Sequence, residues 1–295
     1  TFSSKASENF GANNIDKLNW EKHTQVRSNI GNLNWEKSEF PPEKIKKNNE
    51  AGKIDNILDV RAIGRAVTVN GYMYPEISNY VPNAYVEDWR KTLTISTRGI
   101  SRTRHCDGEN FSINNCLDGV LDMDFNLVNT ESFSFNPKIN VQSLSNRNTS
   151  IGEGISLGFK TARKFSDKWS FALGGENIVH FDNTIDLGRN FYFVASTYKP
   201  LYRTIKKDGA MLFLNIGVGT DFYGYKGNGY LGRMNCFGKP NLTGDGSNNC
   251  TIGPIGSLSI AFNDRLSFNN EWFGYGYGTG FAIRPFKEQS LTLSL

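Results

Sequence analysis

The segment Leu121-Asp122-Met123-Asp124-Phe125-Asn126-Leu127 alternates apolar and polar side chains without a fault. A second segment, Phe133-Ser134-Phe135-Asn136-Pro137-Lys138-Ile139-Asn140-Val141-Gln142, has an apolar residue or Pro at every odd position and a polar residue at every even one. Alternation with a period of two is typical of a β-strand whose two faces meet different surroundings. These segments therefore predict neighbouring strands of an all-β protein.

The same pattern extends over most of the chain after residue 58. About twelve segments follow it. They lie near residues 62–73, 91–100, 119–128, 132–144, 151–161, 167–176, 190–199, 209–220, 254–262, 265–273, 275–284 and 288–295. Some neighbours are joined by tight turns and others by long polar loops, about 101–118 and 221–253. Short turns at one rim and long loops at the other are typical of an antiparallel transmembrane β-barrel.

The chemistry of the two strand faces supports this prediction. One face carries Leu, Phe, Ile and Trp, whereas the other is mostly Ser, Thr, Asn and Gly. A soluble sandwich would instead present many Lys and Glu to water, so we expect a polar lumen inside and hydrocarbon outside. The charged residues predicted to line the lumen are Arg98, Asp122, Asp124, Lys138, Lys160 and Glu176. Their mixed signs predict little preference for ions of one charge.

Composition and motifs exclude several function classes. The 33 Lys and Arg against 29 Asp and Glu leave a formal charge of +4, with no basic stripe to bind nucleic acid. The sequence contains no apolar run of about 18 residues and therefore predicts no membrane-spanning helix. The three histidines, His23, His105 and His180, lie far apart, and no cysteine spacing matches a metal motif. We therefore expect no enzyme activity, no metal and no cofactor.

The four cysteines form two local pairs. Cys106 with Cys116 and Cys236 with Cys250 each bracket a short polar segment within the two long loops. Four cysteines allow three connectivities, and the local one requires the least bending of the chain. We expect two loop disulfides and an oxidising, exported location. Free thiols in a reducing compartment remain the alternative. Because the chain starts with Thr1, we expect either a mature chain after signal-peptide removal or a fragment.

We expect residues 1–57 to form a separate polar segment, disordered or extended, that precedes the β-barrel of residues 58–295. Leu18-Asn19-Trp20-Glu21-Lys22 recurs as Leu33-Asn34-Trp35-Glu36-Lys37. An exposed Trp can anchor a partner's pocket, so Trp20 and Trp35 are candidate binding residues for a periplasmic partner or peptidoglycan. Alternatively, this segment plugs the lumen or is a duplicated linker without a partner.

Residues 60–295 resemble Gram-negative outer-membrane β-barrels of the porin type. The resemblance lies in hairpins such as Ile155 to Leu173 and in the penultimate strand Tyr275-Gly276-Tyr277-Gly278. The Asn-rich leader with its repeated pentamer resembles exported proteins of marine picocyanobacteria. One departure is the last residue, because bacterial barrels usually end in an aromatic residue and this chain ends in Leu295.

The resemblance implies an outer-membrane location and outer-membrane lipid as the partner. We expect a porin-like channel for passive diffusion of small polar solutes or ions. Two alternatives remain open. One is an envelope structural or adhesion protein that displays the disulfide-stapled loops. The other is a soluble secreted carbohydrate-binding β-sandwich.

Overall fold

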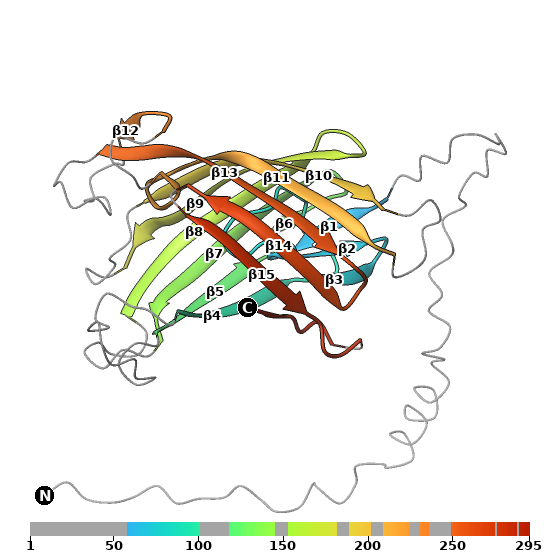
Figure 1. Cartoon of the computed structure of the whole chain (residues 1–295). Helices are drawn as coiled ribbons and strands as arrows, with labels where there is room; N and C mark the ends of the chain where they lie inside the picture. The colour runs from blue at the N-terminus through green and yellow to red at the C-terminus, as the bar shows by residue number, and fades with distance from the viewer. Residues whose placement is uncertain are drawn as a thin grey trace, which may run out of the picture. The chain divides into compact units, whose positions relative to one another are not determined.

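Antiparallel β-strands account for nearly all regular structure in the computed structural model (Figure 1). The structure describes residues 58–100, 118–144, 153–181, 189–201, 209–224, 230–235, 249–274, 276–287 and 289–295. The predicted N-terminal segment 1–57, with Trp20 and Trp35, lies outside these residues. Its boundary and its role therefore stay predictions.

Thirteen strands belong to one large sheet. Its main path is β16 (Leu293–Ser294), β15 (Tyr277–Ile283), β14 (Leu266–Phe273), β13 (Asn249–Ala261), β11 (Met211–Thr220), β10 (Asn190–Pro200), β9 (Trp169–His180), β8 (Glu153–Lys164), β7 (Phe133–Ser143), β5 (Asp118–Phe125) and β4 (Leu93–Ile100). Beside this path, β6 (Val128–Asn129) pairs with β7 and β12 (Arg233–Asn235) pairs with β13. The all-β prediction is confirmed, and every predicted segment except 62–73 overlaps a strand of the path.

Two predicted boundaries were wrong. The expected loop 221–253 contains a short 3-10 helix, η2 (Asp221–Tyr223), together with β12 and the start of β13. The expected strand 288–295 is reduced to the two residues of β16, which pair with Ala282 and Ile283 of β15. The segment before β16 is instead bound to Arg284, because the guanidinium of this residue donates to backbone carbonyls of the segment.

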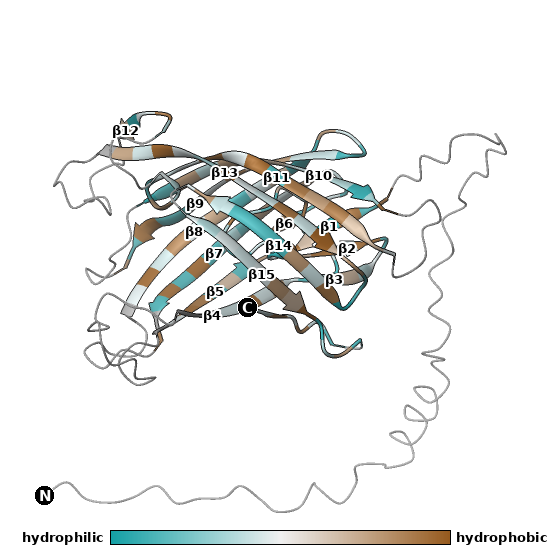
Figure 2. Cartoon of the chain, in the orientation of Figure 1, coloured by the Kyte–Doolittle hydropathy of each residue, from teal (hydrophilic) through white to brown (hydrophobic). Residues whose placement is uncertain are grey.

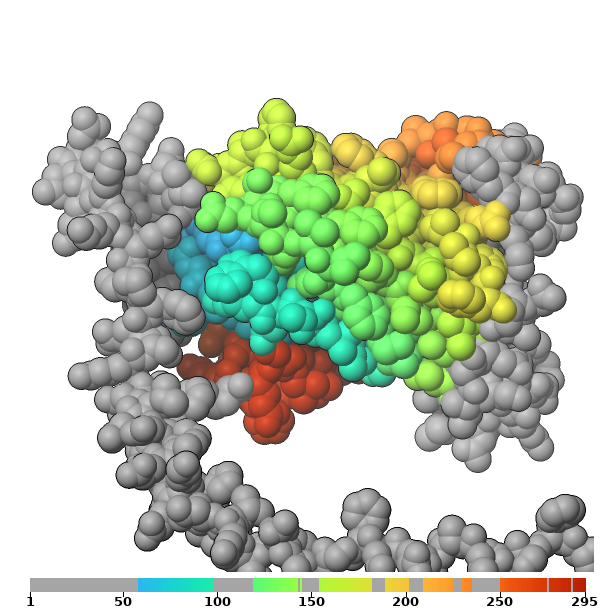
Figure 3. Space-filling view, turned by 180° about the vertical axis from the view of Figure 1, so that it is seen from behind, coloured from blue at the N-terminus to red at the C-terminus, as the bar shows by residue number. Residues whose placement is uncertain are grey.

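The large sheet curls strongly, but it does not close into the predicted barrel. Its two ends are β4 and β16, and no strand pair joins them among the described residues. Strand direction alternates along an antiparallel path, so β4 and β16, at positions one and eleven, run in the same direction. An antiparallel closure would have to join β4 to β15. Seen from behind, β4 lies next to the C-terminal strands (Figure 3). We call this junction between the two ends of the sheet the seam, and Lys91 Nζ donates to Ser290 Oγ across it at 3.0 Å.

A second sheet corrects the prediction of one strand at 62–73. It consists of β1 (Val60–Ile63), β2 (Ala66–Val69) and β3 (Tyr72–Glu76). The first turn contains Gly64 at φ 59°, and the second contains Asn70 at φ 50° and Gly71 at φ 83°. An Asn-Gly pair with positive φ at both positions is typical of a tight hairpin turn. The chain therefore reverses twice within the length predicted for one strand.

This small sheet and the coil after it lie inside the curl of the large sheet (Figure 1). We call residues 58–92 the inner segment. Its apolar side chains form the core with the inner wall of the large sheet. One cluster comprises Leu58, Ala62, Val67, Val69, Tyr74, Ile77 and Tyr85 with Tyr198, Met211, Phe213 and Ala261. A second comprises Val81, Ala84 and Val86 with Ala162, Ala172, Tyr192, Val194, Tyr223 and Ile255.

The outer face of the large sheet is apolar. Hydropathy alternates along each strand (Figure 2), and the exposed positions are the apolar ones. Mid-strand examples are Ile95 (60% exposed), Leu173 (48%), Phe193 (47%), Ile216 (47%), Leu258 (45%) and Phe281 (53%). The inward positions are small and polar, as in Ser134, Asn136, Ser156, Ser196, Asn215, Ser257, Ser259 and Asn269, all buried. The predicted assignment of polar residues to the interior is therefore confirmed for these positions. No helix in the described part of the chain is long and apolar enough to cross a membrane.

A glycine on β9 makes room for an aromatic core residue. Tyr192 is buried and its ring lies across Gly174, its register partner, so closely that a Cβ on Gly174 would overlap the ring. Gly174→Ala is expected to destabilise the fold by about 1–3 kcal/mol, as overpacking does. Urea unfolding in detergent measures this loss. Tyr192→Ala in the same chain removes the collision, so the double variant should lose less than the sum of the two single losses. Additive losses would contradict this packing.

Candidate functional site

The interior of the large sheet is the candidate site, because the predicted lumen residues and the inner segment meet there. After β3, residues 77–92 have no strand partner beyond one isolated bridge from Glu87 to Ala62. Side chains of the wall satisfy much of this buried backbone. Ser196 Oγ accepts the Ala84 N–H at 2.7 Å, and Ser134 Oγ accepts the Glu87 N–H at 3.2 Å.

The strongest of these attachments is the carboxylate of Glu271 on β14. It accepts the consecutive backbone N–H groups of Asn79 (3.1 Å), Tyr80 (2.9 Å) and Val81 (3.1 Å). Glu271 is only 2% exposed. Hydrogen bonds to an ionised, buried acceptor are stronger than neutral ones, and three converge here. Glu271 therefore holds the start of the coil against the wall.

A buried ion pair fixes the end of the same coil. Lys160 Nζ on β8 lies 2.9 Å from Glu87 Oε1, and the two side chains are 4% and 5% exposed. Lys160 also donates to Asn83 Oδ1 at 3.1 Å, and Glu87 Oε2 accepts the Gly64 N–H at 3.3 Å. Removing one member of a buried pair leaves an uncompensated charge and is strongly destabilising. The pair thus connects the wall, the coil and the β1–β2 turn.

A second polar cluster lies on the neighbouring strands β5 and β7. Lys138 Nζ forms an ion pair with Asp124 Oδ1 at 3.0 Å. Asn140 Nδ2 donates to Asp122 Oδ1 at 2.5 Å, and both residues are buried. These groups face inward beside the β1–β2 turn, because a Cβ on Gly64 would lie 3.9 Å from Asp124 Oδ2.

The predicted lumen residues occupy different surroundings. Asp122, Asp124, Lys138 and Lys160 belong to the interior contacts above. Glu176 lies on β9, and its Oε2 accepts a hydrogen bond from Asn190 Nδ2 at 3.4 Å. Arg98 lies on β4, but its side chain is outside the described residues. The Lys160 side chain therefore contacts the inner segment and does not face open water.

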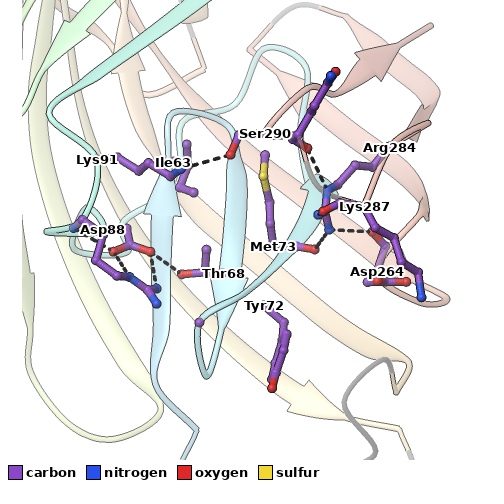
Figure 4. Close-up of a pocket in the computed structure, with 13 residues that line it drawn as sticks. Ile63, Thr68, Tyr72, Met73, Asp88, Lys91, Asp264, Arg284, Lys287 and Ser290 are labelled. Atoms are coloured by element: carbon purple, nitrogen blue, oxygen red, sulfur yellow. Dashed lines mark hydrogen bonds and ion pairs between the residues drawn. The ribbon is translucent and has the colours of Figure 1, made fainter. Parts of the chain in front are cut away.

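One cavity of about 700 Å³ opens where the inner segment meets the C-terminal part of the chain (Figure 4). It is lined by Ile63, Thr68, Gly71, Tyr72, Met73, Asp88, Arg90, Lys91, Asp264, Arg284, Lys287, Gln289 and Ser290. These residues come from the small sheet, from the coil before β4, from the β13–β14 turn and from the segment after β15. The cavity therefore borders the seam of the large sheet.

Within the cavity wall, Asp88 is already paired. Its carboxylate accepts hydrogen bonds from Arg90 Nε at 2.8 Å and from Thr68 Oγ1 at 3.2 Å. Burial of Asp88 opposes its ionisation, but the hydrogen bonds and charge of Arg90 outweigh it and lower the pKa of the carboxyl below its ordinary value. Since the folded pKa is the lower one, this contribution to stability is present at neutral pH and is lost as the pH falls through the folded pKa.

Sequence reasoning missed the residues that bind the inner segment to the wall, namely Glu271, Glu87, Asn83 and Arg284. The pair Asn70-Gly71 was the available signal, because it predicts a hairpin turn inside the segment taken as one strand. The wall partners themselves are too distant in sequence to be paired by inspection; Glu271 lies about 190 residues from its three donors.

Of the four cysteines, only Cys250 is described. It is fully buried and is not a free thiol. The predicted pairings of Cys106 with Cys116 and of Cys236 with Cys250 involve residues outside the described part, so both stay predictions. The described residues contain no group of three His, Cys, Asp or Glu side chains placed to hold a metal ion.

Comparison of the chain with protein-family models, with curated proteins and with solved structures finds no match. The functional argument therefore depends on the geometry of the interior and on the two faces of the sheet.

Glu271→Gln is expected to release the start of the coil. The variant keeps the size of the side chain but replaces a charged acceptor of three N–H groups by a neutral amide. Hydrogen bonds to charged groups are each worth about 1.5–3 kcal/mol. Hydrogen exchange of the Asn79, Tyr80 and Val81 amides should accelerate, while amides of β10 and β11 stay protected.

The matched control is Glu131→Gln, at an exposed position in the β6–β7 turn. It should leave exchange at all these sites unchanged. Equal protection of the three amides in the Glu271→Gln variant and the parent chain would show that this carboxylate does not hold the coil.

Proposed function

We propose that this chain is an outer-membrane channel of the porin type whose lumen is occupied by the inner segment at rest. The observation that carries the proposal is the distribution of polarity. Apolar side chains such as Leu258 and Phe193 are 45% and 47% exposed on the outside, whereas Ser257 and Ser259, on the same strand as Leu258, face inward and are buried. Lipid outside and a polar interior account for this arrangement.

The soluble sandwich alternative fits this distribution poorly. A sandwich buries its apolar strand face between two sheets and presents the polar face to water. Here the apolar face is the exposed one. Aromatic side chains at the turns, such as Phe165 (76% exposed) and Phe262 (47% exposed), also suit a headgroup interface.

Membrane insertion places one requirement on the seam. Unpaired N–H and C=O groups of a sheet edge are costly in hydrocarbon. β4 presents such an edge, whereas β15 is already paired with the two residues of β16 at Ala282 and Ile283. The directions of β4 and β15 are opposite along the path. Antiparallel pairing of β4 with β15, with β16 displaced from this edge, would therefore complete a closed sheet in the bilayer.

The occupied interior supports a gated channel rather than an open pore. Apolar contacts of the small sheet, the Lys160–Glu87 pair and the Glu271 hydrogen bonds all hold the inner segment in the lumen. Small polar solutes or ions would pass only after part of this segment moves. An envelope structural protein with a permanently filled interior is the second candidate, and the buried Lys160–Glu87 pair is the observation that favours it.

The first test is the depth dependence of an introduced charge. Leu258→Arg puts a cation at mid-strand on the outer face and should destabilise the folded protein in liposomes by about 2–4 kcal/mol. Phe165→Arg puts the same charge at a turn and should cost only about 0–1 kcal/mol. Urea titration and gel mobility of the liposome-folded protein measure both. If both variants fold equally well, and the protein stays dispersed without detergent, the membrane proposal fails.

The second test is conductance in a planar bilayer. The parent chain should show long closed periods, and Glu271→Gln should raise the open fraction, about tenfold for each 1.4 kcal/mol of lost attachment. Glu131→Gln should behave as the parent. A protein that inserts but conducts in neither form would instead be the structural envelope protein.

A further inference from the structure

The described residues that line the cavity at the seam carry an excess of positive charge. Among the described residues that line it, the cations are Arg90, Lys91, Arg284 and Lys287, and the carboxylates are Asp88 and Asp264. Asp88 is committed to Arg90 through two guanidinium nitrogens. Three cations therefore face one remaining carboxylate.

Arg284 makes this excess more pronounced, because it is buried without a carboxylate partner in the described structure. Its side chain donates to the backbone carbonyls of Met73 (2.6 Å), Asp264 (3.4 Å), Gln289 (3.4 Å) and Lys287. The residue is only 9% exposed. Carbonyl dipoles satisfy its N–H groups but do not neutralise its charge, and a buried charge is costly without a counter-ion.

The two lysines are placed to complete a site for an anion. Lys91 Nζ reaches across the seam to Ser290 Oγ, while Lys287 is exposed at the mouth and has no ion-pair partner in the described residues. Figure 4 shows Arg284 and Lys287 on one side of the cavity and Lys91 toward the other. An anion between them would meet cations from both edges of the seam.

Part of the remaining wall is apolar, beside the polar residues Thr68, Gln289 and Ser290. Ile63 and Met73 are buried at 7% and 9% exposure, and Tyr72 is 42% exposed. An inorganic anion would leave this surface unused, whereas a carboxylate with a short hydrocarbon body would cover it. Pockets for small molecules typically combine an apolar lining with a few polar groups that fix orientation.

We propose that this cavity binds a small organic acid. Its carboxylate lies beside Lys91, Arg284 and Lys287. Its hydrocarbon body packs on the apolar wall described above. Binding of the acid at this cavity does not depend on the proposed function. The further role of such acids as solutes of the channel does rest on it, and in this respect the inference deepens that function.

The test is calorimetric titration of the full chain in detergent micelles with sodium hexanoate. We expect saturable binding that weakens with added salt, as an electrostatic contact should. Lys287→Glu reverses an exposed charge and should weaken binding by about tenfold or more. Lys199→Glu, at an exposed position on β10 away from the cavity, should leave it unchanged.

Hexanol and inorganic phosphate separate the two parts of the site. Each should bind more weakly than hexanoate, because one lacks the charge and the other lacks the apolar body. Phosphate binding as tight as hexanoate, or equal hexanoate binding by the parent and Lys287→Glu, would overturn the proposal. Binding in micelles without current in a bilayer would reject the channel and leave this site standing; current without hexanoate binding would reject the site alone.

Discussion

The structure depends on one constraint: an irregular stretch of backbone is buried inside a curled sheet, and its polar groups need partners. Residues 77–92 run through the interior without strand neighbours for most of their length. Buried backbone groups are almost always hydrogen-bonded, so the wall must supply acceptors and donors. Glu271, Ser196 and Ser134 do this for backbone N–H groups, and Ser267 and Asn269 donate to the carbonyl of Glu76, the last residue of β3 before this stretch. The polar inner face is thus a structural requirement even where no water fills the lumen.

The wall is divided between polar attachment and apolar packing. Opposite the small sheet it carries Tyr198, Met211 and Phe213, which bury the inward side of that sheet. Opposite the coil it carries apolar residues such as Tyr192 and Val194 together with serine, asparagine and charged residues. A buried ion pair such as Lys160–Glu87 adds little net stability, but it penalises any other position of its partners. Apolar contacts hold the inner segment inside the curled sheet, and polar contacts fix its position there.

The exposed face of the large sheet is apolar, whereas the exposed face of a sheet in a soluble β-protein is polar. Large apolar side chains are exposed along the strands, and the small polar ones are covered. The proposed membrane location rests on this inversion, and the choice between a channel and a scaffold rests on what fills the interior of the sheet. The cavity beside the seam bears on the same question, because among the described residues more cations than carboxylates line it.

Much of the fold could be predicted from the sequence alone. Alternation in segments such as 121–127 and 133–142 determined which side chains share a face, because successive residues of a strand point to opposite sides. It also placed Asp122, Asp124, Lys138 and Lys160 on the inner face. Alternation could not tell what fills the interior, and so residues 62–73 were predicted as one wall strand.

Only the tertiary structure decided that the chain reverses at Gly64 and at Asn70-Gly71 and returns through the interior of the curled sheet. It alone paired Glu271 with backbone groups about 190 residues earlier in the chain. The physical reason is that local periodicity reports the surroundings of a side chain, polar or apolar, but not the identity of the distant group that provides them.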